Sequence, residues 1–406
     1  MVEALFRELG AVVVVDLGFG DAGKGRVVDS LVRTTGARRI LRFNGGAQAG
    51  HTVRHRDGRV HVFSQVGATF TPGVRTLLGG DVRVDFGALG IEAQRLSALG
   101  LADVLDRVDV DGRCAVVTPF HVALNRLREH HRGENRHGSC GAGVGACAEE
   151  VAAGDPVLRV AHLSDRREAL RRSAEAQARA RERASGLDGL ATERALLDDP
   201  TVPSRWLARV APIAAAVRTL DADAVQAAVA EPLIAEGAQG VLLDEHAGFR
   251  PHVTWSVCTP DAAMRTLGRP AAVLGVLRTY LVRHGAGPLP TEDPALDALP
   301  EPDNHPGPWQ GRVRRGWPDL ALLRYARDAC ARVGAPVDRL AVTHLDTAAT
   351  RAWRVAPDRP LPPAGGAWSD APGMRGAETT PTSVEGLLAA FGALVPVGWS
   401  SAGPLS

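Results

Sequence analysis

The chain has 406 residues, of which 45% are hydrophobic and 23% are charged, and its formal net charge is +1. This length is enough for one large domain or for two to three ordinary ones, with a substantial buried core. Because the charge is nearly balanced, bulk attraction to nucleic acid or to anionic lipid is not expected, and small specific ligands are favoured.

The five cysteines also narrow the class of protein. They form no CxxC pair, and an odd number in a chain of this size argues against a disulfide scaffold. The first 20 residues lack a basic segment followed by a cleavage site, so no signal peptide is predicted. No apolar run reaches the roughly 18 residues that a membrane-spanning helix needs. We expect a soluble, cytoplasmic protein that binds small molecules and neither nucleic acid nor membrane.

Strand-like runs alternate with helix-like stretches along the chain. Residues 11–15 (AVVVV) end in a glycine-rich turn, and residues 26–36 then have the apolar spacing of a helix. Similar strand-like runs occur at residues 75–79, 114–120, 232–240, 271–282 and 339–346. This alternation predicts an α/β fold with a large, central, mainly parallel sheet flanked by helices.

Three segments depart from the alternation. Residues 167–199 are rich in Ala, Arg and Glu without proline, which predicts a solvated helical segment. Residues 288–311 are dense in proline and are predicted to form an irregular loop of functional length. Residues 130–137 (HHRGENRH) fit no common zinc spacing and are interpreted as a solvated basic loop. We expect one domain over residues 1–406 with a helical excursion around residues 164–230.

A phosphate-binding loop is predicted at residues 18–26, GFGDAGKGR, which contain the only lysine, Lys24, among 47 basic residues. The segment matches G-x-x-x-x-G-K, whose backbone N–H groups surround phosphate oxygens while the lysine reaches the β and γ phosphates. A planar guanidinium fits poorly in a tight loop of amides, so the retained lysine favours phosphate binding over a simple strand-to-helix turn. Gly25 replaces the Ser or Thr that usually holds magnesium, and Asp21 is the nearest alternative oxygen donor.

This loop resembles that of the adenylosuccinate synthetase family, including the glycine after the lysine and the aspartate within the loop. Further stretches follow in the order of that family: residues 42–53, 137–146, 236–254, 273–292, 311–319, 343–346 and 401–404. The resemblance covers nearly the whole chain. It implies a P-loop-containing fold of that family and a GTP- and Mg²⁺-dependent carbon–nitrogen ligase, which joins IMP and L-aspartate into adenylosuccinate and releases GDP and phosphate.

The resemblance also implies a set of catalytic residues. Asp21 is then both a magnesium ligand and the base that removes the N1 proton of the purine. His51 stabilises or protonates the phosphoryl group in transfer, Gln239 orients the base, and Lys24 neutralises phosphate charge. The backbone carbonyl of Gly50 is the second magnesium contact from the protein.

The binding residues that the resemblance implies fall into three groups, and it also implies a homodimer. Asp346 would accept the guanine hydrogens and so select GTP over ATP, and two arginines suit the carboxylate of an amine donor. The GTP group is Gly18, Gly20, Gly23, Lys24, Gly25, Thr343, Asp346, Ser401 and Gly403. The acceptor group is Asn44, Gln48, Ser139, Cys140, Gln239 and Thr254, and the donor group is Arg312 and Arg314.

Several positions depart from the pattern of the family, mostly on the side of the acceptor and the donor. They are Cys140 for a threonine, Ala142 for an arginine, Ala153 for the arginine that reaches the partner subunit, Trp255 for a small polar residue, Trp309 and Gln310 for two threonines, and His344 for a lysine. The GTP-activating residues are therefore expected to be intact. A paralogue in specialised metabolism is an alternative to the IMP reaction: it would use the same GTP activation on another oxo-bearing nucleotide, nucleoside or smaller metabolite, or with a different amine donor.

Two other classes of function remain open. A GTP-binding regulator needs only the phosphate loop and residues 343–346, but it does not explain the motifs at residues 42–53, 236–240 and 311–315. A small-molecule kinase would stop after phosphoryl transfer, but an arginine pair placed for a carboxylate argues against it.

Overall fold

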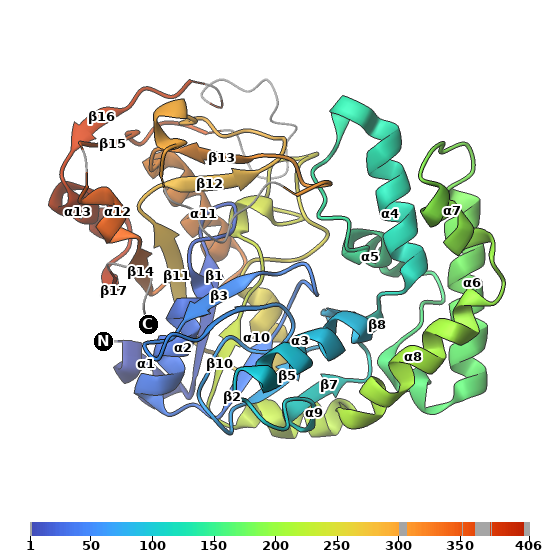
Figure 1. Ribbon diagram of the computed structural model, residues 1–406. Helices are drawn as coiled ribbons and strands as arrows, with labels where there is room; N and C mark the ends of the chain where they lie inside the picture. Colours follow the sequence, from blue (N-terminus) through green and yellow to red (C-terminus); the bar gives the residue numbers. More distant parts are fainter. Residues whose placement is uncertain (1, 300–306, 351, 362–373, 375, 402–406) are drawn as a thin grey trace.

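A nine-stranded sheet forms the centre of the molecule, which is a computed structural model describing residues 2–299, 307–350, 352–361, 374 and 376–401 (Figure 1). All neighbouring strands in this sheet are parallel, which confirms the predicted fold class. From edge to edge the strands are β17 (Val397–Ser400), β14 (Arg339–Thr343), β11 (Ala272–Arg278), β1 (Ala11–Asp16), β10 (Leu233–Glu236), β2 (Arg39–Arg42), β5 (Arg75–Leu78), β7 (Val108–Asp111) and β9 (Arg218–Leu220).

Helices cover both faces of the sheet. All six residues of β1 are buried, with Val13 and Val15 in one core cluster and Val12 and Val14 in another. A parallel strand buried on both faces is a continuous apolar run, as residues 11–15 are. The helices are α1 (Val2–Leu9), α2 (Lys24–Thr35), α3 (Phe86–Ala98), α4 (Pro119–Arg132), α5 (Val144–Ala152), α6 (Arg166–Arg183), α7 (Ala191–Asp198), α8 (Val202–Ala216), α9 (Ala222–Ala230), α10 (Asp261–Leu267), α11 (Leu320–Arg332), α12 (Leu345–Ala348) and α13 (Val384–Leu394).

Four small sheets surround the central one. Three are antiparallel pairs and one is parallel. The antiparallel pairs are β3 (His51–Arg54) with β4 (Val60–Phe63), β12 (Leu281–His284) with β13 (Val313–Gly316), and β15 (Trp353–Val355) with β16 (Thr380–Thr382). The parallel pair is β6 (Arg83–Val84) with β8 (Ala115–Val116).

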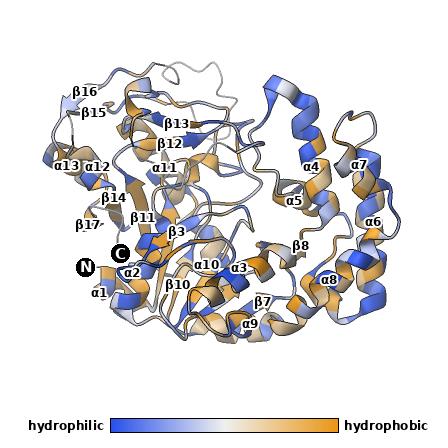
Figure 2. Cartoon of the chain, in the orientation of Figure 1, coloured by the Kyte–Doolittle hydropathy of each residue, from blue (hydrophilic) through white to orange (hydrophobic). Residues whose placement is uncertain are grey.

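Helices α4 to α8 form a layer to one side of the sheet (Figure 1). They have a core cluster of their own, in which Phe120 and Leu124 of α4 join Ala176 and Ala180 of α6. Figure 2 shows α6 as largely hydrophilic, as expected for a helix with one face in solvent. Among the described residues, none of the helices combines the length and the apolarity needed to cross a bilayer.

Element boundaries differ from the predictions at four places. Residues 130–132 of the predicted basic loop are the last turn of α4. The helical segment 167–199 is interrupted between α6 and α7, where Gly186 and Gly189 have φ angles of 75° and 91°. The run 114–120 gives only the two-residue strand β8, because Pro119 starts α4. The run 271–282 divides into β11 and β12, and β12 turns away to pair with β13.

Candidate active site

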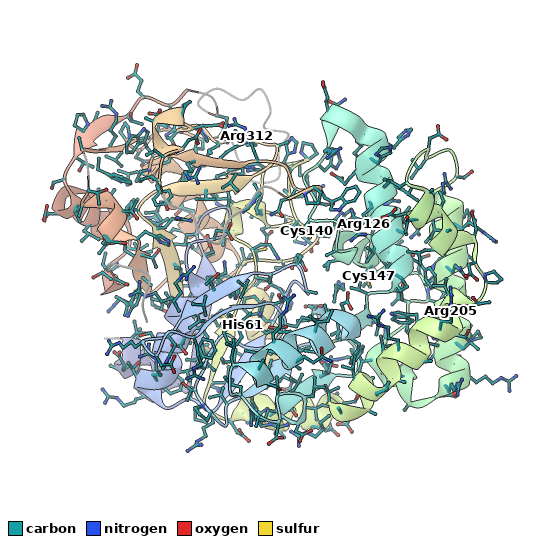
Figure 3. All side chains as sticks on the ribbon, in the orientation of Figure 1. His61, Arg126, Cys140, Cys147, Arg205 and Arg312 are labelled. Carbon is teal, nitrogen blue, oxygen red and sulfur yellow. The ribbon has the colours of Figure 1, made fainter. Side chains whose placement is uncertain are left out.

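A cavity of about 1290 Å³ lies where the central strands end. It is lined by the segments that follow β1, β2, β10, β11 and β14, and on its other side by α4, α5 and the loop between them. Ligands of open parallel sheets bind beyond the carboxyl ends of the strands. Figure 3 shows Cys140 on the α4–α5 side, toward the space between that layer and the sheet.

Most residues that the sequence assigns to the site line this cavity, although they come from distant parts of the chain. Gly18, Asn44, Ser401, Arg312 and Arg314 do not line it, and Gly403 lies outside the described residues. The predicted site residues that do line the cavity are Gly20, Asp21, Gly23, Lys24, Gly25, Gln48, Gly50, His51, Ser139, Cys140, Gln239, Thr254, Thr343 and Asp346.

The side-chain amide of Asn44 is used inside the protein. Its Nδ2 donates to the carbonyl oxygens of Ala238 and Val257 at 3.3 and 2.9 Å, and its Oδ1 accepts from the Ala238 N–H at 2.7 Å. Asn44 therefore fixes the segment that carries Gln239 and does not itself face the cavity.

The ammonium of Lys24 is held by two oxygens. Its Nζ donates to Asp16 Oδ2 at 3.0 Å and to the Gln239 carbonyl at 2.6 Å, and the residue is only 3% exposed. Asp16 also accepts from the N–H groups of Gly18 and Ala22 at 2.7 and 2.9 Å. Asp16 was not among the site residues predicted from the sequence, although an acidic residue at the end of a buried apolar strand is a recognisable signal.

Gly25 has a steric role. A Cβ atom on this residue would lie 2.9 Å from the carbonyl carbon of His51 and 3.0 Å from its oxygen, so β3 occupies the space that a serine or threonine side chain needs. A serine or threonine, whose hydroxyl usually binds magnesium, therefore fits at this position only if the strand that carries His51 shifts.

Asp21 faces the cavity from a left-handed backbone conformation, with a φ angle of 58°. Its Oδ2 lies 2.7 Å from Nε2 of His284, and its carbonyl accepts from Nη1 of Arg278 at 3.0 Å. Burial alone would raise the pKa of Asp21, but the hydrogen bond and charge of His284 hold that pKa below its ordinary value. Asp21 is thus a carboxylate, able to accept a proton or bind a cation.

His51 is paired with a buried carboxylate. Its Nδ1 lies 2.5 Å from Glu236 Oε1, while Glu236 Oε2 accepts from the Ala68 N–H at 3.0 Å. Burial lowers the pKa of His51 to about 4 despite the opposing effect of Glu236. Burial would raise the pKa of Glu236, but Arg42 and His51 lower it. Nδ1–H therefore donates to the carboxylate, and Nε2 is left for the cavity.

The end of β14 and the residues that follow it form the wall of the cavity next to the phosphate loop. The hydroxyl of Thr343 donates to the Ala22 carbonyl at 2.8 Å, which ties this segment to the phosphate loop. Burial holds the pKa of His344 well below its ordinary value, so the residue found where the family has a lysine is neutral. Asp346 and Arg26 also line the cavity. Burial lowers the pKa of Arg26, and the negative charge of Asp346 offsets part of this lowering.

Of the two arginines predicted to hold the amine donor, Arg314 lies on β13 and Arg312 directly precedes that strand, and both donate to the carboxylate of Glu292. Arg312 Nη2 donates to Glu292 Oε1 at 2.8 Å, and Arg314 Nε donates to Glu292 Oε2 at 2.9 Å. Arg314 also donates to the carbonyls of Gly285 and Gly287 at 3.0 and 2.7 Å. Arg314 is thus committed to the turn after β12, whereas the Arg312 side chain is 66% exposed.

At the α4–α5 end of the cavity, the arginines are paired with carboxylates and an aromatic side chain is exposed. Arg128 is bound by both oxygens of Glu149, and Arg132 donates to Glu129 at 2.5 Å. Trp255 lines the same cavity and is 49% exposed. This end therefore combines carboxylate-paired cations with an open aromatic surface.

The polar residues of the loop before α5 are also engaged. The hydroxyl of Ser139 lies within hydrogen-bond distance of both amide atoms of Asn125. It lies 3.1 Å from Oδ1, to which it can donate, and 2.9 Å from Nδ2, from which it can accept. Trp309 packs against Gly141, where an added Cβ would lie 2.5 Å from the indole ring.

Comparison with known proteins decides the family. The family model described as adenylosuccinate synthetase matches residues 13–352. The chain belongs to the adenylosuccinate synthetase family. It is 33% identical over 330 residues to adenylosuccinate synthetase 2 of Chromobacterium violaceum, covering 77% of this chain and 73% of the relative. It is 34% identical over 351 residues to adenylosuccinate synthetase of Symbiobacterium thermophilum, covering 83% and 77% of the two chains.

Two solved structures share the fold of this adenylosuccinate synthetase family chain. Fully ligated adenylosuccinate synthetase from Plasmodium falciparum superposes with a TM-score of 0.79 at 19% identity, covering 97% of both chains. Succinoaminodeoxyadenylate synthetase of cyanophage S-2L, bound to dGMP and dATP, superposes with a TM-score of 0.63 at 21% identity, covering 97% of this chain and 93% of that one. Both confirm the fold, and the family membership makes the chain a ligase that forms carbon–nitrogen bonds.

Proposed function

We propose that this chain uses GTP to join an oxo-bearing purine to an amino acid. By family, the acceptor is IMP and the donor is L-aspartate, and the products are adenylosuccinate, GDP and phosphate. The observation that carries the proposal is the meeting of Lys24, Asp21 and the His51–Glu236 pair around one cavity.

The chemistry requires two displacements. The 6-oxo group of a purine is a poor leaving group, so it first attacks the γ-phosphorus of GTP, and the bond from that phosphorus to GDP breaks. The amine of the donor then attacks C6, and phosphate leaves from the carbon. Loss of the N1 proton makes the oxygen a better nucleophile, which requires a base at the purine edge.

The residues of the cavity suit these steps. Asp21, a carboxylate in the cavity wall, is the proposed base. His51, oriented by Glu236, would take up a proton on Nε2 as the phosphate charge enters the cavity, and Nε2–H would then donate to the phosphoryl group in transfer. Gln239 would orient the base. Lys24 would exchange its contact with Asp16 for phosphate oxygens. Thr343 and Asp346 are proposed to bind the GTP side, and Ser139, Cys140 and Thr254 the acceptor side.

Magnesium fits the oxygen donors that are present. Asp21 has a side chain that is 30% exposed in the cavity, and Gly50 lines the same wall. Within the described part of the chain no three His, Cys, Asp or Glu side chains gather around a metal position, as expected where phosphates and water complete the coordination. When bound, Mg²⁺ neutralises charge on the phosphates.

We also propose a carboxylate-bearing amine donor and a cytoplasmic homodimer. The donor proposal rests on the family motif that contains Arg312 and Arg314, because neither arginine lines the cavity and both already donate to Glu292. The absence of disulfides among the five cysteines supports a reducing compartment. The homodimer rests on the family alone.

A second candidate is the same chemistry on an acceptor without a phosphate. It is favoured by the α4–α5 end of the cavity, where Arg128 and Arg132 are already neutralised by carboxylates and Trp255 offers an apolar surface. A phosphate there would have to displace Glu149 or Glu129 from its arginine.

One assay separates these functions. Release of GDP and phosphate from Mg-GTP is measured with IMP and with inosine, each with and without L-aspartate, and the products are identified by mass. Turnover that needs both IMP and aspartate supports the first proposal, and equal or faster turnover with inosine supports the second. Release without amine indicates a kinase, and no release with any acceptor indicates a GTP-binding regulator.

A further inference from the structure

The last residue of β12 contacts the proposed base directly. His284 Nε2 lies 2.7 Å from Asp21 Oδ2, across 263 positions of sequence. Both side chains line the cavity, with exposed side-chain fractions of 20% for His284 and 30% for Asp21. An ionised carboxylate can only accept, so Nε2–H is the donor.

No other described residue explains the orientation of this imidazole. Its second nitrogen, Nδ1, is buried and has no hydrogen-bond partner within the described part of the chain. The hydrogen bond to Asp21 is therefore the polar contact that His284 makes, and a buried polar atom is left unpaired to allow it.

The carboxylate needs such a support. Asp21 lies in a glycine-rich loop, and its own backbone has the left-handed φ angle of 58°. Arg278 holds its carbonyl at 3.0 Å, but that contact fixes the main chain and not the carboxylate. Without a side-chain contact, the carboxylate would lose rotamer freedom each time it engages a ligand.

We propose that His284 is a positioning residue that holds the carboxylate of Asp21 in its working orientation. This inference rests on the proposed function, since it assigns no role to His284 apart from the one proposed for Asp21. The imidazole itself moves no proton. It reduces the number of orientations that the carboxylate samples before it meets magnesium and the acceptor.

The position of His284 adds a second consequence. His284 pairs with Val313 in the β12–β13 sheet, and the next residue, Gly285, donates its N–H to the carbonyl of Arg312 at 3.0 Å. The residue that orients the base is therefore on the same hairpin as the proposed donor arginines. Removal of the imidazole alone should leave that hairpin, and the KM for the donor, nearly unchanged.

The test compares His284→Leu with His284→Gln. Glutamine can place its Nε2 donor near the position of the imidazole Nε2, whereas leucine keeps bulk without a donor. Measurements are kcat and KM for GTP, the binding of Mn²⁺ in the presence of GDP by electron paramagnetic resonance, and thermal unfolding. His55→Leu is the matched control, because His55 pairs with Asp57 at 2.9 Å outside the cavity.

We expect His284→Leu to lower kcat at least tenfold and to weaken Mn²⁺ binding at least threefold, with KM for GTP within twofold. His284→Gln should recover kcat and Mn²⁺ affinity to within threefold of the natural protein, and His55→Leu should change neither. If leucine leaves both unchanged, or if glutamine is as impaired as leucine, the positioning role is wrong. If the natural protein shows no acceptor-dependent GTP turnover, the proposed function is wrong. That result is distinct from a failure of the positioning role, which the comparison of the variants decides.

Discussion

His51 and Glu236 form a buried pair, with 2.5 Å between Nδ1 and Oε1, although 185 positions separate them in sequence. Arg42 lies near the same carboxylate, with its Nε 4.0 Å from Glu236 Oε2. Glu236 therefore orients a histidine on one side and balances a buried guanidinium on the other.

Replacement of Glu236 by Gln should affect both activity and stability. The neutral amide no longer balances Arg42 and can present its NH₂ group to His51, so kcat should fall at least about tenfold. The free energy of unfolding should decrease by about 1–3 kcal/mol, because the buried guanidinium loses its partner. Steady-state kinetics and urea denaturation measure the two effects. Glu231→Gln is the control, because the Glu231 side chain is 59% exposed, and a loss as large as that of Glu236→Gln would contradict the role of Glu236.

Gly25→Ser should impair the enzyme even though serine is the usual residue at this position of a phosphate loop. The added Cβ would lie 2.9 Å from the main chain of His51, so β3 has to move. We expect kcat to fall at least tenfold and the unfolding free energy to fall by about 1–3 kcal/mol. Gly392→Ser, where an added Cβ meets nothing within 4 Å, should be close to neutral. Full activity of Gly25→Ser would contradict this steric role, because it would show that β3 can shift without loss of function.

Stability should depend on pH through His61, which is 7% exposed and has a pKa lowered to about 4 by burial and by Arg95. Between pH 6.5 and 4 the unfolded chain binds a proton that the folded chain does not, so the unfolding free energy falls as the pH falls. A shift from 6.5 to about 4 corresponds to at most about 3 kcal/mol. His61→Leu should reduce the slope of the profile from urea denaturation at pH 7, 6, 5 and 4, while His51 and His344, whose pKa values are also lowered, keep part of it. The exposed control His131→Leu should leave it unchanged, and equal slopes for all three proteins would refute the assignment.

Glu149→Gln should change the preference for the acceptor. It removes the carboxylate that accepts from Nη1 and Nη2 of Arg128, and the released guanidinium lines the cavity. We expect the ratio of kcat/KM for IMP to that for inosine to rise about threefold to tenfold, a modest gain because the site is partly exposed. Glu193→Gln removes the carboxylate partner of Arg126, which does not line the cavity, and should leave the ratio unchanged. An unchanged ratio for Glu149→Gln would place the phosphate elsewhere.

The sequence predicted those parts of the site that are local in the chain. The phosphate loop is a contiguous pattern, and the parallel sheet follows from alternating apolar runs, so both could be inferred from the order of the residues alone. The family resemblance added His51, Gln239 and Asp346, because their motifs are also contiguous.

The partners of these residues could not be inferred in the same way. Glu236 and His284 act through hydrogen bonds that span 185 and 263 positions, and the spacing of residues does not tell which strand ends meet. The engagement of Arg314 by two carbonyls and Glu292 was likewise hidden, because an exposed arginine and a committed one look the same in sequence.

The contact between Asp16 and Lys24 has a consequence for selectivity among anions. Because the carboxylate and the ammonium lie 3.0 Å apart and are both buried, this pair presents almost no net charge to an approaching ligand. A simple anion such as inorganic phosphate gains little by entering, since it must compete with an internal carboxylate. Only a ligand that makes many further contacts, such as a nucleoside triphosphate, offsets the loss, and the loop thus discriminates by the size of its ligand before any specific recognition of the base.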